Sequence, residues 1–424
     1  SPCRGARDRV MLRIPMSTGR SNTRHCSPLT SLTKVTASRL ALRLSLYYGA
    51  FFSAIGIYVP FWPLWLASRG ANAEEIGILL AVPLWIKVVT NPAIAQTIDR
   101  RGDRKKPQIA LAFGALVTFL LFIPLEGFWP LLVVSLINGV FLAAMLPIGE
   151  NLALLTSYAY RLDYGRIRLW GSLTFMLGAV VGGELLTGRP EDVVMWTIIL
   201  TLGLTVVACL WLPDVRSERS KVAARSISLS LLRHPTLLLF LVAAGCLQSA
   251  HAVYYGFSAI AWRNAGISEA WIGALWAIGV LAEIALFSIS SRLLGWISPT
   301  HLIVLAGAVS VVRWLLTPLT NEVALLAPLQ LLHAFTYGAA HIGAMHFIAR
   351  AAPQTLSATM QSLYSAISLG VIFGTVMLLA GDLYRSIDTD AYFVMAALSL
   401  AGLGAAWVLG RRWSGEELAI GRRG

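Results

Sequence analysis

Apolar runs recur along the chain about every 30 residues, and each is long enough for a helix that crosses a bilayer, which needs about 20 apolar residues. The composition agrees with this reading. Of the 424 residues, 57% are hydrophobic and 13% are charged, whereas about 25% of the residues in an ordinary soluble domain are charged. We therefore predict an all-α polytopic membrane protein that is embedded in the lipid bilayer and has no large soluble domain.

The apolar runs and the breakers between them define twelve predicted transmembrane helices. They cover residues 44–67, 76–97, 108–126, 130–153, 169–187, 193–212, 236–262, 270–291, 301–319, 323–349, 356–380 and 390–410. The longest internal connection separates six helices from six. We expect a basic, disordered N-terminal tail (1–43), a six-helix bundle (44–213), a cytoplasmic linker (214–235), a second six-helix bundle (236–411) and a cytoplasmic C-terminal tail (412–424).

The net charge of +13 has a topological explanation. If the N-terminus is cytoplasmic, the inside segments hold 28 of the 34 basic residues and the outside loops hold four. This asymmetry follows the positive-inside rule, so the charge predicts cytoplasmic termini and gives no reason to expect nucleic-acid binding. The basic N-terminal tail is interpreted as a targeting peptide or as a disordered cytoplasmic segment. A third interpretation is a misassigned translation start, since Met11 and Met16 lie downstream of the first residue.

A short internal repeat indicates that the two halves are related. SRGANAEEIG at 68–77 and NAGISEAWIG at 264–273 share Gly70/Gly266, Ile76/Ile272 and Gly77/Gly273. The same offset sets Lys87 opposite Glu283. Two six-helix repeats joined by a central loop are the plan of the major facilitator transporters.

The loop AQTIDRRGDRKKP also resembles the signature of that superfamily. The resemblance implies a conformational latch. The matching residues are Asp99, Arg100, Gly102 and Arg104. Ala95 and Asp103 depart from the signature, and positive-inside charge alone is the alternative interpretation of this loop.

Charged side chains inside predicted spans are costly in a bilayer, so they usually face a cavity or a partner. Lys87 shares a helix face with Asn91, because the two residues are four apart. Lys87 is either a fixed cation for an anionic substrate or a structural partner of Glu150 or Glu283.

Two carboxylates inside spans have two readings each. Glu150 is close in the chain to Arg166 and Arg168, so it either locks a helical hairpin or contacts substrate. Glu283 falls near the middle of its span. That setting suits a proton-binding group, because desolvation penalises the charged carboxylate. A static ion pair with Arg313 is the alternative.

Two helices carry polar faces at helical spacing. Gln248, His251 and Tyr255 form one, with Tyr254 beside it. The other consists of His333, Tyr337 and His341. Both faces indicate a wet cavity, although a single histidine in a span is often only a packing group. Most of the tryptophans, such as Trp62, Trp65, Trp129 and Trp413, lie near predicted membrane borders and are interpreted as an interfacial aromatic belt.

Several stretches together resemble the 3-phenylpropionate transporter group of the major facilitator superfamily, which stands near lactose permease and the nucleoside/proton symporters. These stretches are QSAHAVYYGFSAIAW with the later AEI, VVRW, LLHAFTYGAAH and YGRIRLWGS. The resemblance implies that Glu283, Arg313 and His333 couple protons and that Glu150 and Arg168 hold substrate. It further implies proton-driven uptake of a small aromatic carboxylate by alternating access.

The residues themselves agree with that expectation. Lys87 and Arg313 supply cations for a carboxylate, and Tyr254, Tyr255 and Tyr337 supply rings. We expect a monomer in the inner membrane whose partners are a small-molecule substrate and protons, without a cofactor or a metal. A nucleoside or sugar symporter and a drug/proton antiporter remain alternatives. The sequence contains no P-loop or HExxH motif that would support an enzyme. A membrane sensor would need an output domain, and we find none in the sequence.

Overall fold

The computed structural model describes residues 29–215, 233–353 and 356–418, and within these ranges every regular element is a helix. The first half contains six long helices, and the predicted transmembrane character of this half is confirmed. They are α1 (Leu29–Ser68), α2 (Ala73–Arg101), α3 (Lys105–Phe122), α4 (Phe128–Tyr160), α5 (Tyr164–Leu186) and α6 (Asp192–Trp211).

The second half contains more breaks within its membrane crossings. Its elements are α7 (Pro235–Ser249), α8 (Ala252–Asn264), α9 (Glu269–Leu293), α10 (Pro299–Leu316), η2 (Thr317–Leu319), α11 (Val323–Leu331), η3 (Ala334–Ala339), α12 (Ala340–Ala351), α13 (Ser357–Leu363), η4 (Tyr364–Ile372), α14 (Phe373–Ile387), η5 (Asp388–Asp390) and α15 (Ala391–Arg412). Of these, η3 and η4 are π-helical, and such turns are frequently found at functional sites.

The described residues contain eleven helical segments that are long and apolar enough to cross a membrane. The last of them, Thr359–Arg412, has 54 residues. At 1.5 Å per residue it measures about 80 Å, more than twice the roughly 30 Å of a bilayer core. The turn η5 divides it, so it provides two crossings. The twelve predicted crossings are therefore all present.

The first helix begins earlier than the sequence predicts. The sequence predicts a first span from residue 44 and a disordered tail over 1–43, but α1 already begins at Leu29. Leu32, Val35 and Leu40 continue the apolar period toward the N-terminus, so the helix extends beyond the uniformly apolar segment. Residues 1–28 lie outside the described part of the chain.

The C-terminal tail is attached to the second half as far as it is described. The indole ring of Trp413 packs against Phe347, with 4.7 Å between the ring centroids. The backbone N–H of Leu418 donates to the carbonyl of Ala351 at 2.9 Å.

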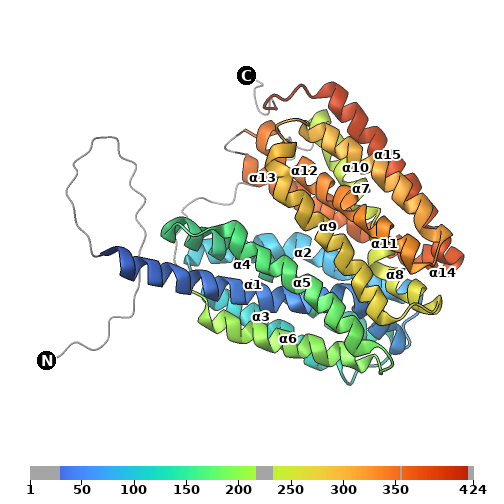
Figure 1. The fold of residues 1–424 in the computed structure, drawn as a ribbon, viewed down its shortest axis with the longest axis horizontal. Helices are drawn as coiled ribbons and strands as arrows, with labels where there is room; N and C mark the ends of the chain where they lie inside the picture. The colour runs from blue at the N-terminus through green and yellow to red at the C-terminus, as the bar shows by residue number, and fades with distance from the viewer. Residues whose placement is uncertain (1–28, 216–232, 354–355, 419–424) are drawn as a thin grey trace.

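The helices form two bundles, α1–α6 and α7–α15, that meet at one end and spread apart toward the other (Figure 1). We call the end with the α6–α7 connection and the end of α15 the linker side. The far side carries the turns at 69–72, 187–191 and 265–268. The bundles meet on the far side, where α5 packs on α9 and α2 packs on α14.

Close helix crossings hold the far side together. A Cβ atom on Gly183 would lie 2.2 Å from the carbonyl oxygen of Glu269, and one on Gly273 would lie 2.2 Å from that of Ala179. Small residues permit such backbone contact between membrane helices. The guanidinium of Arg263 also spans the two bundles. It lies 2.7 Å from Glu191 and 2.6 Å from Glu269.

Candidate functional site

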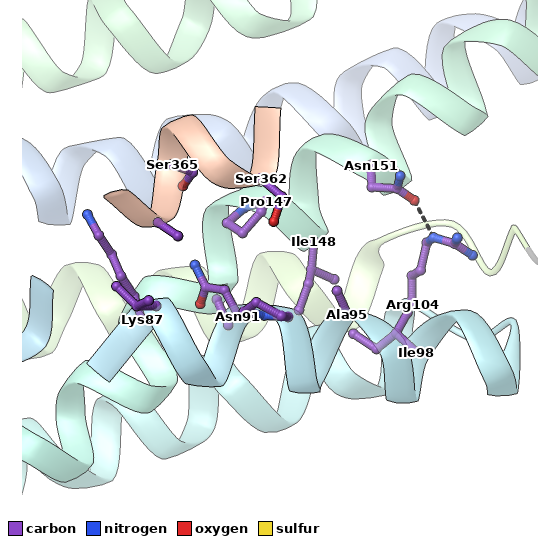
Figure 2. Close-up of a pocket in the computed structure, with 14 residues that line it drawn as sticks. Lys87, Asn91, Ala95, Ile98, Arg104, Pro147, Ile148, Asn151, Ser362 and Ser365 are labelled. Carbon is purple, nitrogen blue, oxygen red and sulfur yellow. Dashed lines mark hydrogen bonds between the residues drawn. The ribbon is translucent and has the colours of Figure 1, made fainter. Parts of the chain in front are cut away.

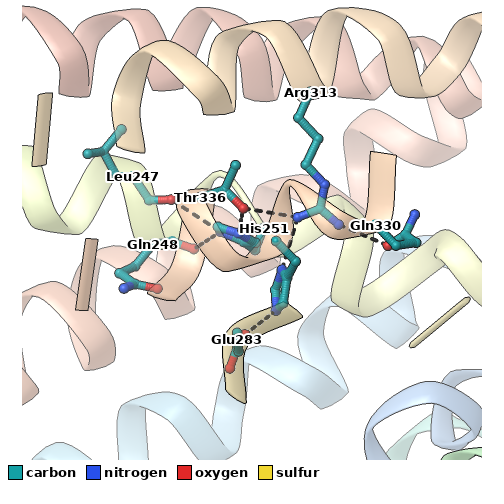
Figure 3. Close-up of polar contacts among 8 residues, drawn as sticks. Leu247, Gln248, His251, Glu283, Arg313, Gln330 and Thr336 are labelled. Atoms are coloured by element: carbon teal, nitrogen blue, oxygen red, sulfur yellow. Dashed lines mark hydrogen bonds and ion pairs between the residues drawn. The ribbon is translucent and has the colours of Figure 1, made fainter. Parts of the chain in front are cut away.

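Arg313 of α10 is the centre of a buried polar cluster in the second bundle (Figure 3). Its Nη1 donates to His333 Nδ1 at 2.9 Å and to Thr336 Oγ1 at 3.0 Å, and its Nη2 donates to Gln330 Oε1 at 2.9 Å. All three acceptors lie in or beside α11 and η3. Among the described residues, no carboxylate forms a direct ion pair with Arg313. The buried cation is held by neutral acceptors instead.

Aromatic rings complete the surroundings of Arg313. Its guanidinium carbon lies 4.9 Å from the ring centroid of Tyr254 and 4.5 Å from that of Trp314. These distances are within the range of cation–π attraction, which is strengthened when the cation is desolvated.

His333 connects Arg313 to Glu283. Its Nε2 lies 2.8 Å from Glu283 Oε1 on α9. Arginine has only donors, so Nδ1 of His333 must accept the hydrogen bond from Arg313. The proton of the neutral ring is therefore on Nε2, from which it is donated to Glu283. The alternative that we considered for Glu283, a direct ion pair with Arg313, is not what the structure shows.

His251 joins the same network with the opposite tautomer. Its Nδ1 faces the carbonyl oxygens of Leu247 at 3.2 Å and Gln248 at 3.1 Å, so Nδ1 carries the proton. Its Nε2 lies 3.1 Å from Thr336 Oγ1 and accepts the hydroxyl proton of Thr336. His251 occupies the break between α7 and α8, where the helix is not continuous. Gln248 is buried next to it.

The two predicted polar faces lie side by side as aromatic stacks. The rings of His333 and Tyr337 stack with centroids 5.5 Å apart, and those of Tyr337 and His341 stack at 6.2 Å. From α8, Tyr254 and Tyr255 stack on Trp276 at 4.6 and 5.6 Å. Sequence reasoning did not identify Trp276, Trp314, Gln330 or Thr336. The three-residue spacing of Gln330, His333 and Thr336 was the available signal.

Lys87 and Asn91 of α2 line a cavity of about 280 Å³ between the bundles (Figure 2). Asn151 of α4 and Ser362 and Ser365 of α13 and η4 contribute further polar groups to its wall. Within the described chain, Lys87 forms no hydrogen bond or ion pair. Neither Glu150 nor Glu283, the two structural partners that we considered, pairs with it.

Lys87 also lines a second cavity of about 400 Å³ that is largely aromatic and apolar. Phe51, Phe52, Tyr58 and Trp62 of α1 form one wall, and Tyr255, Phe373 and Met377 of the second bundle close it. The belt interpretation of Trp62 and Trp65 was wrong, because their side chains are 3% and 0% exposed. Both indoles pack inside the first bundle, where Trp62 stacks on Trp65.

Glu150 and Arg168 form an ion pair between α4 and α5, with 3.3 Å between Oε1 and Nε. The guanidinium carbon of Arg168 lies 4.3 Å from the ring centroid of Phe52. Arg168 therefore contacts Phe52, a ring that lines the aromatic cavity. The other arginine that we considered, Arg166, pairs with Asp163 instead.

The loop that resembles the superfamily signature contacts α4. Gly102 caps α2 with a φ of 70°, a conformation that favours glycine. Arg104 is buried and donates to Asn151, the neighbour of Glu150 (Figure 2). The side chains of Asp99 and Arg100 lie outside the described part of the structure.

Two bundles of six crossings, with polar groups and cavities where they meet, define a membrane transporter of the major facilitator type. The chain belongs to the MFS_1 like family, whose model matches residues 41–395. It is 32% identical over 373 residues to a "probable 3-phenylpropionic acid transporter" of Escherichia coli K12, which covers 85% of this chain and 95% of that relative.

Two other proteins extend the comparison. The maltose permease of Geobacillus stearothermophilus is 24% identical over 380 residues, or 88% of this chain and 95% of the permease. A crystal structure of a mutant of the nucleoside transporter NupG superposes with a TM-score of 0.79 at 12% identity, over 87% of this chain and 99% of that one. The fold and the relatives identify a transporter and not an enzyme.

Proposed function

We propose that this protein is a proton-coupled symporter of a small aromatic carboxylate. The observation that supports the proposal most directly is the position of Lys87. Lys87 lines both the polar cavity and the aromatic cavity, and no described residue neutralises its charge. A carboxylate on Lys87 would supply the missing counter-charge, and a phenyl ring would fill the space beside Phe52, Tyr58 and Trp62. The name of the relative from Escherichia coli favours the same substrate class.

The substrate and the buried network would meet at Tyr255. Its ring borders the aromatic cavity and lies 5.6 Å from the ring of His251. Arg313 is less suited than Lys87 to bind the carboxylate, because its Nη groups already donate to His333, Thr336 and Gln330. In this assignment Lys87 binds the carboxylate of the substrate, whereas Arg313 holds the buried hydrogen-bond network together.

We assign the coupled proton to Glu283. While Glu283 is a carboxylate, it accepts the Nε2–H of His333 and compensates the charge of Arg313 through that ring. Protonation of Glu283 removes its negative charge, so the positive charge of Arg313 is no longer compensated. Binding of an anionic substrate would restore a negative charge to the site. Substrate and proton would therefore bind together, which is the requirement for symport.

The positive-inside asymmetry supports an inner-membrane protein with the linker side in the cytoplasm. The bundles meet on the far side and spread apart on the linker side, so this conformation would be the inward-facing one. Rocking of one bundle against the other would expose the site to the outside. The site lies between the two halves of one chain, so a monomer is sufficient for the proposed cycle.

The proposal is tested by uptake of radiolabelled 3-phenylpropionate into proteoliposomes with and without an imposed proton gradient. We expect accumulation that an uncoupler abolishes. Lys87→Gln should reduce carboxylate uptake at least about 30-fold, since a buried charged hydrogen bond contributes about 2 kcal/mol or more. Lys87→Arg should retain part of the activity. Uptake that is insensitive to the uncoupler contradicts symport.

A neutral substrate is the second candidate, because one relative is a maltose permease. The same vesicles distinguish the two. If Lys87→Gln transports maltose or a nucleoside as well as the unsubstituted protein does, and neither protein transports the aromatic acid, the assignment of a carboxylate is wrong. Drug export would appear instead as proton-dependent efflux of the tested solute.

A further inference from the structure

A lateral groove opens on the outer surface of the first bundle, apart from the cavities around Lys87. Its volume is about 1000 Å³, its floor is α1, and its walls are α5 and α6. The two wall helices are joined by the turn at 187–191 on the far side. Their other ends, at Tyr164 and Trp211, are not joined directly to each other, and α1 is accessible between them.

The lateral groove is lined mainly by apolar side chains on its floor and its walls, and several of them are exposed. Leu42 and Leu46 of the floor are 59% and 41% exposed, and Leu204 of α6 is 53% exposed. These residues belong to segments that cross the membrane, so hydrocarbon chains surround them. The groove is thus suited to an acyl chain.

The mouth of the groove lies at the linker side and is basic. Arg161 and Arg166 line it. Arg39 and Arg43, both exposed, each follow a groove-lining residue of α1 and lie on the flank of the same helix face. The acidic residue at the mouth, Asp163, is occupied, because it accepts from the Arg166 backbone at 3.1 Å and lies 3.2 Å from Arg166 Nε.

Arg161 is the guanidinium at this mouth that is free to bind. It forms no hydrogen bond or ion pair with its side chain within the described residues. It ends α4 with a φ of 52°, a left-handed conformation that glycine or asparagine adopts more readily. The long cationic side chain of Arg161 is therefore present where the backbone favours a small residue. Left-handed conformations of this kind at non-glycine residues are concentrated at functional sites.

Two tryptophans mark the depth of the mouth. Trp170 of α5 and Trp211 of α6 both line the lateral groove, and they are 53% and 58% exposed. Indoles of this kind locate at the level of lipid headgroups. Gly49, on the floor, lies about 15 Å further along α1 than Arg39, so the groove extends from the headgroup level into the hydrocarbon.

We propose that the lateral groove is a binding site for an anionic glycerophospholipid of the leaflet on the linker side. The phosphate group would pair with Arg161, and the charge of Arg166, which already pairs with Asp163, would lie beside it. The glycerol region would lie at the level of Trp170 and Trp211, and one acyl chain would cover the face of α1 around Ser45. Basic pockets between transmembrane helices bind anionic headgroups in this manner. The site is independent of the proposed transport substrate.

The test uses the purified full chain in detergent and native mass spectrometry with added dioleoylphosphatidylglycerol or dioleoylphosphatidylcholine. We expect the anionic lipid to bind at least about tenfold more tightly than the zwitterionic one. In Arg161→Asn/Arg166→Gln the preference should fall to about one, since each basic residue near a headgroup contributes about a fivefold gain in affinity. Asparagine tolerates the left-handed backbone at 161, so α4 should keep its end.

Two further variants distinguish a built site from surface charge. Ser45→Phe fills the groove without changing its charge and should weaken binding of the anionic lipid by at least tenfold. Arg350→Gln/Arg412→Gln removes two exposed arginines from the same side of the membrane, outside the lateral groove, and should leave the preference unchanged. The thermal unfolding midpoint of each variant checks that it is folded.

Three results would overturn the proposal. The first is an unchanged preference in the Arg161→Asn/Arg166→Gln protein. The second is an equal loss in the Arg350→Gln/Arg412→Gln control, which would mean that general surface charge attracts the lipid. The third is displacement of the lipid by glycerol phosphate at the same concentration, which would indicate a soluble anion that needs no groove.

Discussion

At the scale of single residues, Arg313 shows how a permanent charge is kept inside the second bundle. It is fully buried, yet the groups that take its Nη hydrogens are an imidazole, a hydroxyl and an amide. Burial of a charge without a partner is strongly destabilising. The compensating carboxylate, Glu283, reaches Arg313 only through His333. One protonation event at Glu283 would therefore alter the whole cluster.

The prediction at this scale concerns Glu283→Gln. The amide oxygen of glutamine can still accept the Nε2–H of His333, so we expect the protein to fold, with an unfolding midpoint within a few degrees of the unsubstituted protein. It cannot bind and release a proton. We expect exchange of labelled for unlabelled substrate to persist and proton-driven accumulation to fall to the equilibrium level. Accumulation that still responds to the proton gradient would exclude Glu283 as the coupled group.

At the scale of elements, the long helices were predictable and their breaks were not. Apolar length located the crossings, because a bilayer demands it. The interruption at His251 and the π-turn η3 form contacts with Thr336 and Arg313 from other helices, which the sequence does not show. The single glycine of η3, Gly338, was not enough to predict the π-turn. The burial of Trp62 was missed for a related reason, since the sequence does not show which face of α1 meets Phe119 and Phe122.

For the candidate site, the sequence predicted which residues take part but not how they are arranged. Glu283, Arg313 and His333 stood out because ionisable groups in apolar spans are rare, and the structure brings them into one cluster. The sequence alone did not indicate that His333 lies between the other two. Nor did it indicate that Lys87 lacks a partner, because pairing depends on how the two bundles meet.

The prediction for elements concerns the crossing of α5 and α9. A methyl group at Gly183 would lie 2.2 Å from the carbonyl oxygen of Glu269, so the helices must separate. We expect Gly183→Ala to destabilise the far-side closure by about 1–3 kcal/mol, as overpacking does, and to lower uptake by about tenfold. Gly203→Ala in α6 is the control, because open space surrounds that position. Equal effects of the two variants in thermal unfolding and uptake would contradict this account.

At the scale of the whole molecule, ion pairs, a hydrogen bond and helix crossings join the bundles on the far side. Arg385 of α14 lies 3.6 Å from Glu74 of α2, and the backbone N–H of Ala270 donates to Thr187 Oγ1 at 3.1 Å. Arg263 of α8 reaches Glu191, between α5 and α6, and Glu269, at the start of α9. Two close helix crossings accompany it: α5 on α9 through Gly183 and Gly273, and α2 on α14 through Gly77 and Gly381. The internal repeat at 68–77 and 264–273 covers two of the turns on this side, which explains why similarity between the halves was detectable there.

Breaking the Arg263 bridge should shift the molecule toward the conformation that is open on the far side. Only the Arg263–Glu191 pair links the two bundles, because Glu269 belongs to the same bundle as Arg263. A partly exposed ion pair contributes at most about 1 kcal/mol, so its loss corresponds to a shift of up to about fivefold in population. We would measure it with Tyr58→Cys, a position in the aromatic cavity, labelled by an impermeant maleimide from the far side of sealed vesicles. Arg263→Gln should raise the labelling rate by that factor, whereas Arg189→Gln, an exposed arginine in the neighbouring turn, should not. If both variants label at the unsubstituted rate, the Arg263 bridge does not hold the far side closed, and the remaining contacts there, the helix crossings and the Arg385–Glu74 pair, are sufficient.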